Sequence, residues 1–220
     1  MAIATILEGR FSTRAFLPDP VPQDILHSLF EAAQRSPSNC NVQPWQSLVV
    51  SEKAKDKLSQ ALLEEILSGK EPYPDFDWNV KYQGVHRERQ IGAANALYTA
   101  MGIARDNKPA RQMAMGRNWL FFDAPHAVFF AMDLSLGIMG AVDLGIYAQT
   151  LSLAMAEQDI SSCMQGALGQ FPGPIKQAFN LPEGCGILFG MSFGYADQNN
   201  PVNDVRTSRE DISKSVIFKS

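Results

Sequence analysis

The chain has 220 residues, of which 45% are hydrophobic and 19% charged, and its formal net charge is −4. This length and composition predict a single domain, residues 1–220, with a sizeable hydrophobic core. Nucleic acids and anionic membranes are bound by basic surfaces, so the acidic balance argues against both as partners. The three cysteines form no C-x-x-C pair and the three histidines are scattered, which argues against disulfides and a metal site and favours a reducing cytoplasm.

The first 70 residues combine helical patterns with one short strand. Apolar residues recur at helical spacing between Pro22 and Pro37, and again before Ser68-Gly69, a pair that is typical of a helix end. The elements expected here are a helix or extended lead-in over 2–8, helices over 23–35 and 52–67, and a strand over 47–50.

Residues 70–82 break this pattern because prolines and aromatic residues crowd into them. Such a segment is unusual for a plain linker, so we expect either a flap over a substrate or a packed surface loop. Its aromatic residues are Tyr73, Phe76, Trp78 and Tyr82. Together with the helical patterns that follow, the segment predicts a helical and aromatic excursion over residues 70–120, on the substrate side of the domain.

The second half of the chain predicts the rest of the sheet and one long helix. Residues 138–158 are apolar nearly all round, which in a small domain suggests a central helix that a partner chain helps to bury. Asp143 and Gln149 argue against a membrane span there. Residues 196–220 show no strong period and are expected to form a C-terminal extension. Further elements expected are helices over 84–103 and 108–119 and strands over 127–131, 160–164 and 186–193.

The segment 10–14, with the sequence RFSTR, places two guanidinium groups and two hydroxyls within five positions. In an extended or turned backbone, Arg10, Ser12 and Arg14 point to one side. Arginine donors with a hydroxyl between them suit a phosphate group, which accepts charge-assisted hydrogen bonds.

The segment 36–45, SPSNCNVQPW, is a breaker-rich loop of small amides and hydroxyls that ends at Pro44 and Trp45. It has no nucleophile–base pair, so the two segments fit a phosphorylated heterocycle better than a hydrolase. No G-x-G-x-x-G or G-x-x-x-x-G-K-[ST] pattern supplies another phosphate site, which leaves arginines for that task. Arg206 and Arg209 could join the first pair only through the fold; otherwise they belong to a solvated tail.

In combination, the two segments resemble the FMN-dependent nitroreductase family, whose signature opens R-x-S-x-R and continues S-P-S-N-x-N-x-Q-P-W after one helix. The resemblance covers nearly the whole chain and is strongest to the nitrobenzoate reductase-like branch. It implies an α+β nitroreductase-like fold with a central, mostly antiparallel sheet flanked by helices, in a homodimer whose C-terminal extension wraps the partner subunit. Later segments that carry it are Arg87–Arg89, Leu97-Tyr98, Arg117–Pro125, Gln165–Gly169 and Arg206–Arg209.

The resemblance also implies which residues hold FMN. Arg14 would reach the N1/C2-carbonyl edge of the flavin ring, where a positive charge stabilises the reduced form and raises the reduction potential. Gln165 and Gly166 would lie by the flavin face and N5. The phosphate and ribityl end would be held by Arg10, Ser12 and one or both of Arg206 and Arg209, with Phe11 in the same cofactor-binding set. Pro37, Ser38, Asn39 and Asn41 would reach the FMN of the opposite subunit, so that each site requires the homodimer.

By the same resemblance, NADH or NADPH would deliver a hydride to the flavin and leave, and a small nitroaromatic or quinone-like acceptor would then stack on the same face. No catalytic acid or base can be nominated from the sequence. Arg111 or Arg117 could meet an acceptor carboxylate, with a surface ion pair as the alternative. Candidate aromatic contacts to the substrate are Tyr73, Phe76, Trp78 and Tyr82, with core packing as the alternative for each.

The chain departs from the family pattern in three places, one of which lies before the strand that follows Ala124, where Arg117 and Leu120 stand in place of the Asn and Lys of some members. Many members have lysine at the position of Arg14 and a Glu-Gly pair at the position of Gln165-Gly166, so any role that needs a carboxylate there is absent.

Two alternatives stay open: the same fold with ene reduction or reductive dehalogenation, and a non-enzymatic flavin-binding protein. The Glu, Tyr and Lys triplet of the dehalogenases is not clearly matched by Tyr82, Arg87 and Glu88.

Overall fold

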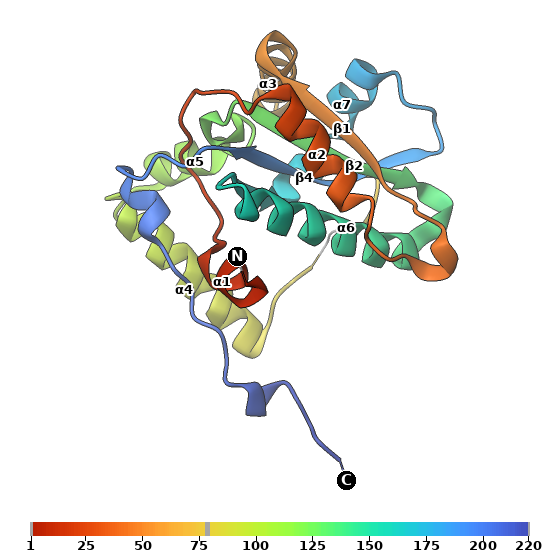
Figure 1. Cartoon of the computed structure of the whole chain (residues 1–220). Helices are drawn as coiled ribbons and strands as arrows, with labels where there is room; N and C mark the ends of the chain where they lie inside the picture. Colours follow the sequence, from red (N-terminus) through yellow and green to blue (C-terminus); the bar gives the residue numbers. More distant parts are fainter. Residues whose placement is uncertain (1, 78–79, 220) are drawn as a thin grey trace.

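The computed structural model describes residues 2–77 and 80–219 and is built around one four-stranded sheet (Figure 1). The strands lie in the order β1-β2-β4-β3, and each ladder between them is antiparallel, which confirms the predicted sheet. A bulge between Phe130 and Ala131 shifts the β2–β4 register. The strands span β1 Gln46–Ser51, β2 His126–Asp133, β3 Ser161–Gln165 and β4 Cys185–Gly194.

Seven α-helices occur in the described part of the chain, and six of them were predicted from periodicity or as the short lead-in. The seventh, α7, was not predicted; it opens with Pro172, Gly173 and Pro174, residues that are more typical of a loop. Proline is tolerated in the first turn of a helix, where its missing N–H has no partner to lose. The helices span α1 Ile3–Gly9, α2 Gln23–Ala33, α3 Glu52–Leu67, α4 Gly84–Ala100, α5 Lys108–Gly116, α6 Gly137–Glu157 and α7 Pro172–Phe179.

Strand β2 is buried on both faces because its alternate side chains enter two different cores. Phe130 packs in one core with α2 and α6, and Phe129 packs in the other with α3 and α7. Trp45 ends the loop after α2 by stacking on Tyr147 of α6, with 4.8 Å between the ring centroids. Trp45 is therefore a packing residue of this core.

Helix α6 is the long apolar helix that the sequence predicts. With the turn before it, Leu134–Glu157 is long and apolar enough to cross a membrane by length and composition. Its inner face, which includes Tyr147 and Leu151, fills the core against the sheet. The buried central helix of a globular domain can be as long and as apolar as this one. Its other face leaves Ile138 and Val142 exposed in the single chain.

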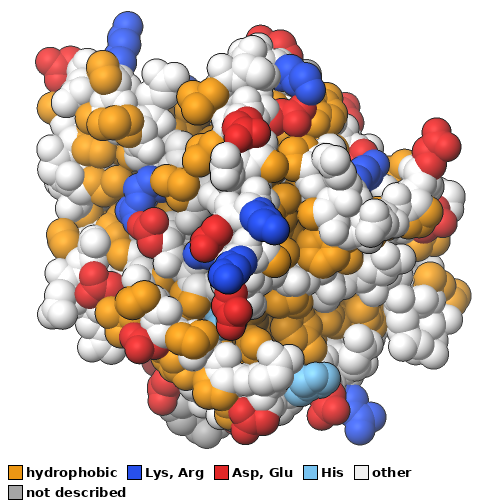
Figure 2. All heavy atoms as spheres, turned by 90° about the horizontal axis from the view of Figure 1, so that it is seen from above, with side chains coloured by type: hydrophobic (Ala, Val, Ile, Leu, Met, Phe, Trp, Pro, Cys, Tyr) orange, Lys and Arg blue, Asp and Glu red, His pale blue; other side chains and the backbone are white. Residues whose placement is uncertain are grey.

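Helices α4 and α5 form a lobe beside the sheet, and neither helix contains a buried residue. The C-terminal segment runs past α4 and then leaves the body of the molecule (Figure 1). The excursion over 70–120 on the substrate side and the extension over 196–220 that wraps a partner remain predictions. On the face in Figure 2, charged side chains of both signs are interspersed with apolar ones.

Candidate functional site

The opening motif is held to the edge of the sheet by its backbone. Thr13 donates its N–H to the carbonyl of Ser162 on β3 at 3.1 Å, and Ser12 pairs with Ser162 in an isolated parallel bridge. Thr13 is fully buried, whereas the neighbouring Ser12 and Arg14 are partly exposed. This alternation is the one the sequence predicts for an extended segment, with Thr13 facing the core.

The fold brings the early and late arginines together. A cavity of about 550 Å³ is lined by Arg10, Ser12 and Arg14 from the opening motif and by Arg206 and Arg209 from the C-terminal segment. Helix α4 closes another side of it with small and apolar side chains. Arg206 and Arg209 are exposed in the single chain, yet they line this cavity beside the opening motif, so their role in holding a ligand remains a prediction. Four guanidinium groups around one cavity favour an anionic occupant such as a phosphate.

Arg206 and Arg209 differ in how they are held. The guanidinium of Arg206 lies 3.7 Å from the ring centroid of Phe11 and donates to the carbonyl of Asn203 at 2.6 Å. The guanidinium of Arg209 donates to the carbonyl and hydroxyl of Thr207, within its own segment. Arg206 is thus docked on the opening motif, which also gives Phe11 a place in the site.

Asn203 joins the two ends of the chain, and sequence reasoning missed it. Its buried side chain accepts the N–H of Arg14 at 2.8 Å and donates to the carbonyls of Ala15 at 2.8 Å and Asp197 at 2.9 Å. Both the oxygen and the nitrogen of the Asn203 amide therefore form their hydrogen bonds with backbone groups. No pattern in the sequence distinguishes this asparagine, because its partners Arg14 and Ala15 lie nearly 190 positions away.

A second cavity, of about 220 Å³, adjoins the first, because Arg14 and Leu97 line both. Cys163 and Gln165 of β3 form one wall. A second part of the lining comes from α4, α5 and the segments after them, and apart from Arg117 and Asn118 it is apolar and aromatic. Its apolar and aromatic residues are Leu97, Tyr98, Met101, Ala114, Met115 and Phe122. A flat heterocycle with an anionic tail has the shape and polarity of the two cavities taken together.

Cys163 contributes a neutral thiol to this wall. Burial raises the pKa of its thiol, and this effect outweighs Arg14, Ser12 and Arg10, which act in the other direction. A thiol with a raised pKa is a poor nucleophile, so covalent catalysis by Cys163 is not supported.

The loop after α2 lies away from these cavities in the single chain. Asn39 donates its N–H to the carboxylate of Asp143 on α6, at 3.0 and 3.2 Å, and Cys40, Asn41 and Gln43 adopt left-handed backbone angles. The loop sits near the beginning of α6, while the segment after α1 lies toward its other end (Figure 1). One chain therefore does not bring Pro37, Ser38, Asn39 and Asn41 to the arginines.

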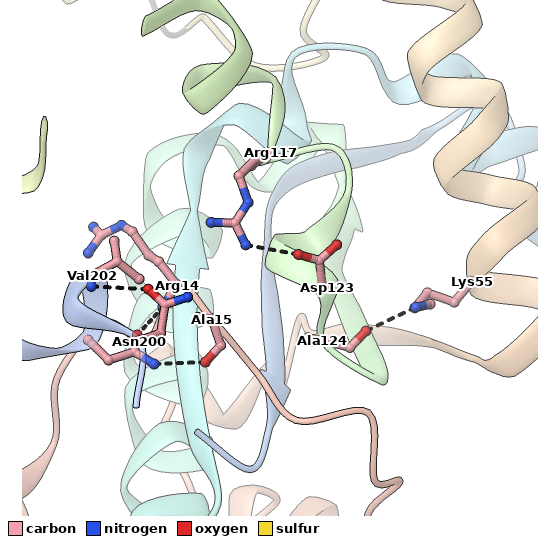
Figure 3. Close-up of polar contacts among 9 residues, drawn as sticks. Arg14, Ala15, Lys55, Arg117, Asp123, Ala124, Asn200 and Val202 are labelled. Atoms are coloured by element: carbon pink, nitrogen blue, oxygen red, sulfur yellow. Dashed lines mark hydrogen bonds and ion pairs between the residues drawn. The ribbon is translucent and has the colours of Figure 1, made fainter. Parts of the chain in front are cut away.

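Arg111 and Arg117 are both engaged in the described structure. The guanidinium of Arg111 lies 4.5 Å from the ring centroid of Tyr98. Arg117 lines the 220 Å³ cavity and forms an ion pair with Asp123 at 2.9 Å (Figure 3). An acceptor role for either arginine remains a prediction.

The described aromatic residues of 70–82 line neither of the two cavities. Tyr73 donates its hydroxyl to Glu65 at 2.8 Å, and burial together with Glu65 raises the pKa of Tyr73 to about 12. Phe76 packs over Gly186 of β4. The packed-loop alternative thus fits both, while Tyr82 is exposed and Trp78 lies outside the described residues.

Comparisons with known proteins point to one family. A sequence model of the nitroreductase family matches residues 7–195. The nitroreductase NfnB of Mycolicibacterium smegmatis is 38% identical over 99% of this chain and 92% of that protein. A 4-nitrobenzoate reductase of Pseudomonas putida is 33% identical over 93% of this chain and 90% of that protein.

Solved structures agree with the sequence matches. The FMN-dependent nitroreductase NfnB from Mycobacterium smegmatis, crystallised in complex with NADPH, gives a TM-score of 0.94 at 37% identity, covering 99% of this chain and 98% of that one. The FMN and NADPH-dependent nitroreductase NfnB from a sphigopyxis strain gives 0.96 at 29% identity, covering 100% of both chains.

Proposed function

Because the chain belongs to the nitroreductase family, we propose that it is an FMN-dependent oxidoreductase that uses NADH or NADPH to reduce small nitroaromatic or quinone-like acceptors. The observation that carries the proposal is the convergence of Arg10, Ser12, Arg14, Arg206 and Arg209 on one cavity. The relatives described above act on nitro compounds and the related structures are FMN- and NADPH-dependent, which supports the same chemistry here.

The donor set of the two cavities fits FMN. Arg10, Ser12 and Arg206 would hold the phosphate, and the apolar wall of the smaller cavity would receive the ring. When bound, FMN supplies hydride transfer from the nicotinamide donor to the acceptor in two half-reactions. Arg14 lies between the two ends, where its positive charge would face the electron-rich edge of the ring.

The backbone of β3 provides the other proposed contact. The side chain of Gln165 is engaged inside the protein with Ser192 and Asn118, so it is not free to reach a ligand. The contact near N5 would come from the backbone of Gln165 or Gly166. The role of this wall is to present an N–H and to exclude water from the reacting face.

The site would be completed by a second subunit. Pro37, Ser38, Asn39 and Asn41 lie away from the arginines of their own chain, so they would serve the FMN of the partner. Exposed apolar side chains support a homodimer, because Ile138 of α6 is 80% exposed and Phe218 of the C-terminal extension is 86% exposed. Covering them would bury the outer face of α6 and give residues 196–220 a surface to wrap.

The acceptor would be a small aromatic molecule, since the wall of Tyr98, Met101, Met115 and Phe122 is apolar. Arg117 is placed to meet an acceptor carboxylate if it leaves Asp123, which is exposed. This is the arrangement expected for a nitrobenzoate.

The test begins with the absorbance spectrum of the purified protein and the identity of its chromophore after acid release. FMN near one per subunit is expected, followed by NAD(P)H oxidation with 4-nitrobenzoate and none with benzoate. A colourless protein that fails to bind added FMN overturns the proposal. Bound FMN with turnover of halophenols or activated alkenes only indicates a different flavin chemistry, and bound FMN without turnover indicates a non-enzymatic role.

A further inference from the structure

Gln165 is a buried residue whose whole amide is used to connect the sheet to the turn after α5. Its Oε1 accepts a short hydrogen bond from the hydroxyl of Ser192 on the neighbouring strand β4. Its Nε2 donates to the carbonyl of Asn118 at 2.9 Å and to the side-chain oxygen of Asn118 at 3.2 Å. Asn118 in turn donates to the carbonyl of Met115 at 2.9 Å. A continuous chain of hydrogen bonds therefore runs from the buried sheet to the end of α5.

The turn that Gln165 holds is strained. Phe121, Phe122 and Asp123 have φ values of 54°, 54° and 65°, three consecutive left-handed residues without a glycine. Such a conformation persists only where its surroundings fix it, and strain of this kind is concentrated at functional sites. Phe121 is anchored in the core, and Lys55 of α3 donates to the carbonyl of Ala124 at 3.1 Å (Figure 3).

The same turn forms one wall of the 220 Å³ cavity. Met115, Asn118 and Phe122 line this cavity together with Arg14. The lobe of α4 and α5 that carries the rest of that wall contains no buried residue in either helix. The hydrogen bonds from Gln165 to Asn118 join the beginning of this turn to the sheet. The rest of the turn is held by its buried side chains Phe121 and Phe122 and by the hydroxyl of Ser59, which donates to the carbonyl of Trp119 at 2.9 Å.

We propose that Gln165 is a positioning residue that sets the acceptor-side wall of the cavity by holding the turn from Asn118 to Asp123. The effect that we expect on kinetics rests on the proposed function. The hydrogen bonds from Gln165 to Asn118 do not depend on that function. An amide is required because one end must accept from Ser192 while the other donates twice to Asn118. A carboxylate of the same shape can only accept, and it would face two oxygen atoms of Asn118.

The decisive variant is Gln165→Glu, with Gln177→Glu as its control. Gln177 is exposed on α7, so this control makes the same chemical change away from the site. Hydrogen exchange of the FMN-free protein is expected to become about tenfold faster across residues 117–124 in Gln165→Glu, because two hydrogen bonds are lost there. Exchange in the strands is expected to stay unchanged. If Gln165→Glu fails to fold, Gln165→Met removes the same donors without adding a charge.

Kinetics supply the second readout. The KM for the nitroaromatic acceptor is expected to rise about tenfold in Gln165→Glu, with FMN content per subunit retained because the phosphate arginines are unaltered. Unchanged exchange at 117–124, or faster exchange spread evenly over the whole protein, overturns the proposal. If the wild-type protein neither binds FMN nor turns over, the proposed function fails, and the exchange experiment still decides whether Gln165 holds the turn.

Discussion

Replacing Asn203 by alanine tests whether the two ends of the chain build the anion cavity together. The change removes three hydrogen bonds, to the N–H of Arg14 and to the carbonyls of Ala15 and Asp197. At about 1 kcal/mol for each net hydrogen bond, the free energy of unfolding should fall by about 3 kcal/mol. Asn203→Asp keeps the acceptor for the N–H of Arg14 and loses only the hydrogen bonds donated to Ala15 and Asp197. Because its carboxylate would then face two carbonyl oxygens, this variant should be no more stable than Asn203→Ala.

The loss should also reach the cavity, because Asn203 positions the backbone of Arg14 and its own carbonyl accepts the guanidinium of Arg206. We expect weaker FMN binding in both variants, measured by titration of the FMN-free protein, and lower stability, measured by urea unfolding. Asn199→Ala is the control, since Asn199 is exposed, and it should change stability by less than about 0.5 kcal/mol. A loss below about 1 kcal/mol in Asn203→Ala, or unchanged FMN affinity, would refute the reasoning.

Three further predictions follow from the same contacts. Arg206→Lys should weaken FMN binding about tenfold, because lysine loses the planar stack on Phe11, whereas Arg209→Lys should weaken it less; titration compares them. Burial, and to a smaller extent Lys55, lowers the pKa of His126 to about 4, so the unfolded chain binds the extra proton as pH falls below 6.5. Stability should be full above that pH and fall by about 2 kcal/mol by pH 5, a loss that unfolding curves should show to be smaller in His126→Gln. Gly169→Ala should lower the melting temperature, because its Cβ would lie 2.5 Å from the carbonyl of Leu188, whereas Gly92→Ala has open space in α4 and should raise it slightly.

The parts of the fold that sequence predicts are those set by neighbouring residues. Helix α3 has the predicted bounds, because its apolar spacing and the Ser68-Gly69 pair are local signals. Helix α7 was missed because its opening Pro172-Gly173-Pro174 carries the local signal of a loop, and only packing of Ile175 against the sheet overrides it. The tertiary context decides such a short segment.

In the candidate site too, the residues that could be predicted are those whose placement depends on their neighbours in sequence. Arg10, Ser12 and Arg14 could be predicted because alternation within five residues places them on one side. The roles of Asn203 and Gln165 could not, because their partners lie 189 and 47 positions away. An amide side chain has the same local signature on a surface, in a turn or in a buried network, and only the fold distinguishes these cases.

The hydrogen bonds of the arginines explain how the cavity keeps its positive charge. Among the described residues, none of Arg10, Arg14, Arg206 and Arg209 forms an ion pair with a carboxylate. Arg14, Arg206 and Arg209 instead donate to backbone carbonyls, which orient a guanidinium without neutralising it. The four arginines outnumber the one carboxylate that lines the cavity, Glu8, and their like charges repel one another. An anion that binds the folded chain relieves this repulsion. Binding of the phosphate end should therefore both fix the ligand and stabilise the junction between the two ends of the chain.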